Sequence, residues 1–330
     1  MRKHLTTYRV LLCFFLLCPF VTFGQTETTA LLNKLNKARL QSNFKTDTAS
    51  VILLNSLTEK YFYSSTDTAQ LFVKEALALA KAQKFEKGVA LSYNNTARVY
   101  YILGSYFPSL TAADDAMAVS QKIGYKTGIG AAYNNKGLIY LAQDRMHDAI
   151  YEFGKSLNYA QQLKDSAKLA ANYFNIGLCY DEIKQVDKAF DYLKKGMVVA
   201  ERTKNWHMYQ MTLNRMGETY YHAKNYPQAL KHYSQALNFK RYQDNWEKGF
   251  AYSGWGKLIT NWADTTRPLI IPRRVWLFRL ALMPAGMCNV PTIYWGKAMP
   301  PYTIIKMLTQ TRCCRKSMPI VCSLHLKKLK

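Results

Sequence analysis

Residues capable of acid–base, phosphate or metal chemistry are scattered through the sequence rather than gathered in a recognisable site. The central histidines show no spacing typical of metal ligands: His147, His207, His222 and His232. The tripeptide Lys126-Thr127-Gly128 is the nearest approach to a phosphate-binding loop, but Gly128 stands where a helix is expected to end. The acidic pairs Asp114-Asp115 and Asp181-Glu182 are expected on solvated helix faces. We therefore predict no catalytic residue, no metal site and no cofactor, and a protein that is not an enzyme.

One set of polar side chains is regularly spaced, at intervals of forty residues: Asn95, Asn135, Asn175 and Arg215. Three of the residues just before them are also asparagines: Asn94, Asn134 and Asn214. An asparagine side chain can donate to and accept from one peptide unit of an extended ligand. A ladder of such side chains would hold a peptide backbone independently of its sequence. The alternative is that these side chains form hydrogen bonds with neighbouring helices.

The same forty-residue period runs through the small and apolar residues that must position this ladder. Small residues recur at one position: Ala97, Gly137, Gly177 and Gly217. Tyrosine follows three residues later: Tyr100, Tyr140, Tyr180 and Tyr220. Small residues recur again twelve and nineteen residues after the first position, at helical spacing. Each unit therefore predicts two helices joined by a short polar turn, and stacked units bury the apolar face that one pair alone would expose.

This pattern resembles the tetratricopeptide repeat family. The family has a glycine followed by an aromatic residue and by alanines at fixed offsets, and one unit of this chain matches at five positions: Gly217, Tyr220, Ala229, Tyr233 and Ala236. The period is forty rather than about 34 residues, which we attribute to longer second helices such as Tyr192 to Arg202. The resemblance implies an all-α, right-handed superhelical solenoid of antiparallel helix pairs. Units of this length also resemble the periplasmic sensor regions of some bacterial signalling proteins.

The domain organisation follows from the period. A helical lead-in is expected over residues 25–47, followed by repeats over 48–264. The expected units are about 48–87, 88–127, 128–167, 168–207, 208–247 and a partial unit 248–264.

The resemblance also implies where a ligand would lie. In this family the first helices line a concave groove, and Asn and Arg at the ladder position contact ligand in the peptide-binding members. The ladder residues are therefore expected to share the concave side, where four further side chains would set specificity: Arg98, Tyr101, Phe174 and Tyr221. On this interpretation Asn135→Ala would weaken a ligand by roughly 1 kcal/mol or more.

Met1 to Gly24 is typical of a secretory signal peptide. Arg2 and Lys3 precede an apolar run from Val10 to Phe20, and the small residue Gly24 stands before the expected cleavage site. The run is shorter than the ~20 residues of a membrane-spanning helix. We therefore expect export to the periplasm or the extracellular space, with an uncleaved anchor as the alternative.

The net charge of +24 is unevenly distributed along the chain. All 21 acidic residues lie within 25–264, whereas residues 265–330 contain none and carry twelve Lys and Arg. The repeat region is thus only mildly basic, and we expect no nucleic-acid partner.

Residues 265–330 form an anomalous basic tail that holds seven of the ten prolines and no helical period. Dropping two nucleotides from the codon of Tyr294 and reading on forces Leu-Gly and permits Tyr and Ala at the repeat offsets. We interpret the tail as translated out of frame, with a basic segment that contacts an acidic membrane surface as the alternative. Without its next repeat, the last helix is expected to expose apolar side chains: Trp255, Leu258 and Ile259.

These observations favour a non-enzymatic scaffold, exported from the cytoplasm, that binds a peptide or a protein partner in the groove. The alternative function is the truncated sensory region of a bacterial two-component or transcriptional signalling protein.

Overall fold

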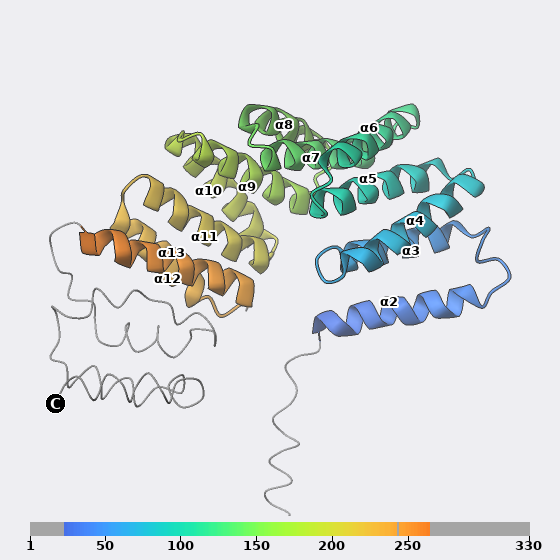
Figure 1. Ribbon diagram of the computed structural model, residues 1–330, viewed down its shortest axis with the longest axis horizontal. Coiled ribbons are helices and arrows are strands. Elements are labelled where there is room, and N and C mark those ends of the chain that lie inside the picture. Colours follow the sequence, from blue (N-terminus) through green and yellow to red (C-terminus); the bar gives the residue numbers. More distant parts are fainter. Residues whose placement is uncertain (1–22, 243, 265–330) are drawn as a thin grey trace, which may run out of the picture. The chain divides into compact units, whose positions relative to one another are not determined.

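The computed structural model describes residues 23–242 and 244–264, and within them every regular element is an α-helix (Figure 1). The helices are α2 (Phe23–Arg39), α3 (Thr48–Tyr61), α4 (Thr66–Ala82), α5 (Glu86–Ile102), α6 (Tyr106–Lys122), α7 (Lys126–Ala142), α8 (Met146–Gln162), α9 (Ser166–Glu182), α10 (Val186–Arg202), α11 (Trp206–His222), α12 (Tyr226–Leu237) and α13 (Asn245–Asp264). None of them is long and apolar enough to cross a membrane. Most of the expected signal peptide and the whole basic tail lie outside the described residues.

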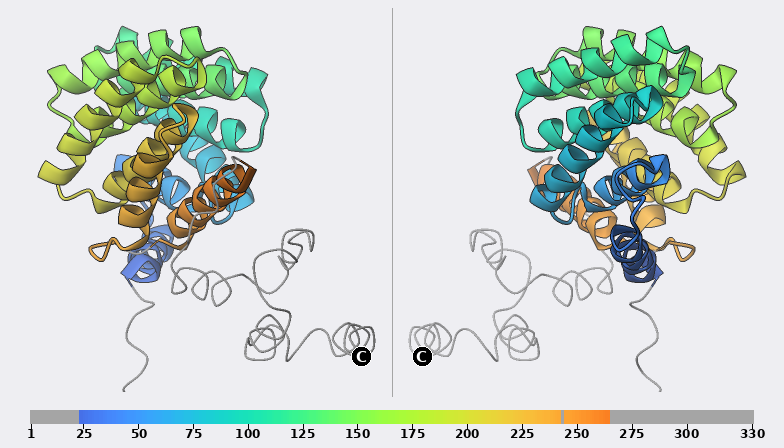
Figure 2. Two further views of the ribbon diagram at one scale, coloured as in Figure 1. Left: turned by 90° about the vertical axis from the view of Figure 1, so that its left-hand side faces the viewer. Right: turned by 90° about the vertical axis from the view of Figure 1, so that its right-hand side faces the viewer.

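The chain divides into two compact units, Met1–Leu258 and Ile259–Lys330, and the repeats belong to the first. Consecutive helices of this unit pack against each other as pairs, beginning with α3 and α4. The first helices of successive pairs also touch, since α3 contacts α5, α5 contacts α7 and α9 contacts α11. The second helices of successive described pairs make no comparable contact. The first helices therefore form the inner layer of a curved stack, and the second helices the outer layer (Figures 1 and 2). This arrangement confirms the predicted all-α solenoid of helix pairs.

The turns between helices explain the regular period. Every helix from α4 to α11 has 17 residues, and each of the turns that follow α4 to α11 has one residue in the left-handed region. In the first of these turns, Lys84 has φ 52°, and the N–H of Phe85 donates to the Ala80 carbonyl at 2.9 Å. This is the Schellman arrangement, in which a left-handed residue lets the chain turn back and satisfies the last carbonyls. First and second helices are equally long, so our attribution of the period to longer second helices alone was wrong, and α10 begins at Val186 rather than Tyr192.

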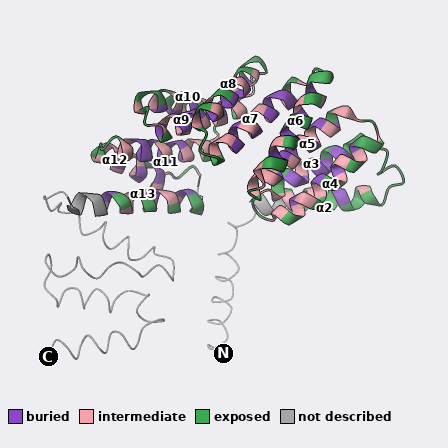
Figure 3. Ribbon diagram, turned by 45° about the horizontal axis from the view of Figure 1, so that its top comes forward, coloured by how far each residue is buried: buried purple, intermediate pink, exposed green. Residues whose placement is uncertain are grey.

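Buried residues recur on every helix instead of gathering in one central core (Figure 3). The recurring glycines have a steric role within each pair. A Cβ on Gly137 would lie 2.6 Å from the ring of Phe153, and one on Gly217 would lie 2.8 Å from the ring of Tyr233. Both rings are fully buried. The small residue on the first helix thus makes room for a large one on the second.

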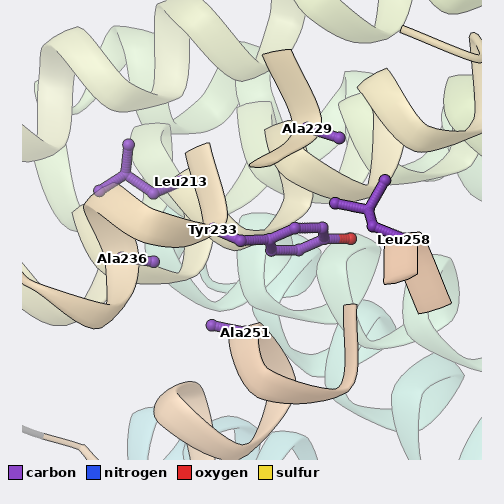
Figure 4. Close-up of a cluster of buried hydrophobic side chains, with 6 residues drawn as sticks. All are labelled: Leu213, Ala229, Tyr233, Ala236, Ala251 and Leu258. Atoms are coloured by element: carbon purple, nitrogen blue, oxygen red, sulfur yellow. The ribbon is translucent and has the colours of Figure 1, made fainter. Parts of the chain in front are cut away.

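The last described helix, α13, packs apolar side chains over Tyr233 of α12. Leu258 of α13 is only 3% exposed and packs with Leu213, Tyr233 and Ala251 (Figure 4). Trp255 is half-buried against the same cluster. The expectation that Leu258 would be exposed was therefore wrong, because α12 supplies a large aromatic ring for it to cover. The side chain of Ile259 lies outside the described set.

Candidate functional site

Asparagine side chains join the first three inner helices. The side-chain amide nitrogen of Asn95 in α5 donates to the backbone and side-chain oxygens of Asn55 in α3, at 3.3 and 2.9 Å. One pair later, Asn135 in α7 donates in the same way to Asn94 in α5, at 3.0 and 3.2 Å. Asn94 in turn donates to the Gly128 carbonyl of α7 at 3.1 Å. These contacts form a polar ladder from α3 to α7.

This ladder holds helices together and does not present its amides to a ligand. Asn95 and Asn135 are 6% and 8% exposed, and both donate to the preceding inner helix. Asn94 is also buried, and buried Asn214 donates to the backbone and carboxylate of Glu247 in α13. The predicted peptide clamp is therefore wrong at these four positions. Buried amides must find partners, and the neighbouring backbone is nearer than any ligand.

The ladder is interrupted between α7 and α9. By the forty-residue period, Asn175 of α9 and Asn134 of α7 correspond to Asn135 and Asn94, which are joined one pair earlier. Here the two side chains are half-buried and form no side-chain hydrogen bond with any described residue, and α7 does not pack on α9 as α5 packs on α7. We call Asn134 and Asn175 the open rung. It leaves two amide groups, each a donor and an acceptor, accessible on the inner layer.

Substitution by alanine should affect stability differently at a bonded ladder position and at the open rung. Asn135→Ala is expected to lower the free energy of unfolding by about 1–2 kcal/mol relative to Asn134→Ala, because it leaves the buried side-chain oxygen of Asn94 without the Asn135 donor. Both substitutions replace asparagine by alanine in one helix, so the gain in helix propensity cancels between them. Urea unfolding followed by circular dichroism measures the difference. Equal stability of the two variants would contradict the assignment.

Ionisable side chains replace the asparagines between α9 and α11. Asp181 of α9 is fully buried and lies 3.0 Å from Nδ1 of His222 in α11. Arg215 is the fourth member of the predicted ladder. Its Nη1 lies 3.9 Å from Oδ2 of Asp181 and 3.7 Å from Oε1 of Glu182. The guanidinium therefore pairs with the preceding inner helix, as the asparagines do. Our placement of the pair Asp181-Glu182 on a solvated face was wrong for Asp181, whose partner His222 lies one period along the chain.

Glu218 is the centre of this charged network. Its carboxylate accepts hydrogen bonds from the Tyr233 hydroxyl at 2.6 Å and from Lys257 at 2.9 Å, and His222 lies 3.6 Å away. Burial alone would raise the pKa of Glu218, but the hydrogen bonds from Tyr233 and Lys257 outweigh it and lower that pKa. Burial and the bond to Glu218 raise the pKa of Tyr233, so the phenol stays protonated. The network thus fastens α11 to α12 and α13.

The other predicted groove residues divide between surface and core. Arg98 is half-buried, with its guanidinium 5.8 Å from the ring of Tyr101. Burial raises the pKa of Tyr101. Tyr221 is half-buried and packs against Tyr226. Phe174, in contrast, is 8% exposed and packs with Leu193 and Met216, so its assignment to the groove was wrong.

Charges on distant inner helices affect one another. Burial raises the pKa of Glu59 in α3, while the amide of Asn95 and the charge of Lys168 act to lower it. Lys168 belongs to α9, three pairs further along the chain.

Nothing in the described part of the chain forms a metal-binding cluster of His, Cys, Asp and Glu. Cys179 is buried, and burial raises the pKa of its thiol to about 12, so it is protonated and a poor nucleophile at neutral pH.

Comparison with known proteins agrees with the repeat geometry. Residues 128–202, which cover the third and fourth helix pairs, match the family model of the tetratricopeptide repeat. The structure of BtubC (BKLC) from P. vanneervenii is similar with a TM-score of 0.53 at 18% identity, over 68% of this chain and 95% of that one. Aspartyl phosphate phosphatase F from Bacillus subtilis has a TM-score of 0.50 at 16% identity, over 67% of this chain and 64% of the phosphatase. No curated protein matches the sequence. At these identities the similar structures concern the fold alone.

Proposed function

We propose that this chain, whose residues 128–202 match the tetratricopeptide repeat, is a non-enzymatic scaffold that binds a peptide or protein partner along its inner helices. The observation that carries the proposal is the open rung, Asn134 and Asn175. These two amides stand where the fold elsewhere joins its helices, yet they are half-buried and unbonded among the described residues. A peptide unit of an extended partner has the complementary donor and acceptor.

The neighbouring side chains would extend such a contact. Arg98 of the preceding inner helix, α5, is half-buried, and the adjacent Tyr101 offers an apolar ring with a polar tip. Arg98 suits a carbonyl or carboxylate of the partner.

The experiment selects 12-residue peptides from a phage-displayed random library on the full-length chain. We expect Asn134→Ala and Asn175→Ala each to weaken a selected peptide about tenfold or more, equivalent to ~1.4 kcal/mol, without lowering stability. Gln121→Ala, an exposed change on outer helix α6, is the control. The proposal fails if no peptide is selected, or if the selected peptides bind both inner variants as tightly as the unchanged chain.

Export stays a prediction from residues 1–24. We propose a periplasmic or extracellular location on that basis. No feature of the described residues favours a nucleic-acid partner, a membrane contact by the tail, or the truncated-sensor alternative.

A further inference from the structure

The second helix of the fifth pair ends five residues early. α12 has 12 residues, whereas the equivalent helices have 17. The residue at position 240, compared with the equivalent residues of the earlier pairs, explains why the helix ends early. In the earlier pairs it holds a small, fully or almost fully buried residue: Ala80, Ser120, Ala160 and Ala200. The fifth pair has Lys240, which is exposed. A lysine cannot take a buried alanine position without a partner for its charge, so the helix ends at Leu237.

A second residue accommodates this early end. Gln210 of α11 is fully buried, and its side-chain amide donates to the Ala236 carbonyl at 3.0 Å. Earlier first helices have only small residues at this position: Ala90, Gly130 and Ala170. The glutamine therefore satisfies a carbonyl near the shortened end of α12. Two independent sequence changes, Lys240 and Gln210, thus support one local structure.

A broadly open cavity of about 450 Å³ lies between the start of α11 and the end of the shortened helix. Aromatic and aliphatic groups and amides line it, with two cations from the segment after α12: Tyr209, Leu213, Gln235, Asn238, Phe239, Lys240 and Arg241. The rings of Tyr209 and Phe239 stack at 5.2 Å. Arg241 lies over the adjacent Trp206 ring at 4.7 Å. Burial raises the pKa of Tyr209, and the negative charge of Glu201 raises it further.

We propose that this cavity binds an acidic peptide segment that carries an apolar side chain between carboxylates. The aromatic rings and Leu213 would receive the apolar side chain, since stacked rings offer a rigid apolar surface. Lys240 and Arg241 would pair with the flanking carboxylates, and the side-chain amides of Gln235 and Asn238 would meet the peptide backbone. The site is separate from the open rung, so either proposal can fail without the other.

The experiment measures binding of a fluorescent peptide, acetylated and amidated at its ends, with a central phenylalanine flanked by two glutamates on each side. The blocked ends exclude the terminal carboxylate as the recognised group. With the full-length chain we expect Arg241→Gln to weaken binding about tenfold or more, and Lys231→Gln, an exposed change on α12, to leave it unchanged. Replacing the peptide's phenylalanine by alanine, or its glutamates by glutamines, should weaken binding comparably.

A second variant tests the origin of the cavity. Gln210→Ala with Lys240→Ala restores the residues of the earlier pairs, and should lengthen α12 and abolish binding while the protein stays folded. Circular dichroism measures the gain of helix, and Asn134→Ala should bind the acidic peptide normally. The proposal is overturned if the peptide does not bind at millimolar concentration, if the glutamine peptide binds equally well, or if Arg241→Gln has no effect.

Discussion

Replacing Phe153 with alanine is expected to lower the free energy of unfolding by about 3–5 kcal/mol. The ring is fully buried in a cluster with Ala149, Ile176 and Cys179, so it joins the third helix pair to the fourth. Gly137 leaves the space that the ring occupies, and no other side chain stands there to fill the resulting cavity. Urea unfolding followed by circular dichroism gives the change in stability.

The matched controls reproduce a pair of residues that the chain already has one unit earlier. One unit earlier, the positions of Gly137 and Phe153 hold Ala97 and Ala113, both fully buried. Gly137→Ala alone should destabilise by about 1–3 kcal/mol, because its new methyl group would press on the ring. The double variant reproduces the alanine pair and should lose less than the sum of the two single changes. Additive losses would contradict the proposed steric exchange between the two positions.

Glu218→Gln is expected to lower the free energy of unfolding at neutral pH by about 2–3 kcal/mol, since it weakens charge-assisted hydrogen bonds in a nearly buried site. The folded state lowers the pKa of Glu218 below its ordinary value of 4.5. A carboxyl with a lowered folded pKa stabilises the protein above the unfolded pKa. That contribution disappears as the pH falls through the folded pKa. The difference between the two proteins should therefore be full above about pH 5.5 and shrink below pH 4.5.

Thermal unfolding at several pH values from 3 to 8 measures this difference. Glu201→Gln, at an exposed position of α10, serves as the control and should change stability by less than about 0.5 kcal/mol. A Glu218→Gln defect that stays constant down to pH 3 would show that the carboxylate charge contributes nothing to the network.

The helix pairs could be predicted from the sequence because their determinants are local and repeated. Glycine or alanine at one position, a large residue sixteen positions later and small residues between them determine how two adjacent helices cross, as Gly137 and Phe153 show. The turns have the same local origin, since one left-handed residue such as Lys84 reverses the chain. The equal length of first and second helices was missed because polar turn residues do not show where the last helical hydrogen bond forms.

The inner surface could be located from the sequence only in part. The spacing of Asn94, Asn95 and Asn135 indicated that these residues share one layer, and the structure places them between inner helices. It could not show whether their amides bind a ligand or another helix. That choice depends on the distance between helix pairs, which no property of a single pair determines.

The same residue types therefore make different contacts at different points along this chain. The sequence alone determined the repeat, the helix pairs and the polar character of their inner face, because these follow from contacts between residues near one another along the chain. Only the tertiary structure decided that Asn135 bonds to Asn94 while Asn175 does not bond to Asn134, and that Asp181 is buried against His222. The physical reason is that each of these partners lies about forty residues away along the chain. A hydrogen bond forms only where the stacking of two helices brings the donor and acceptor atoms within about 3 Å of each other.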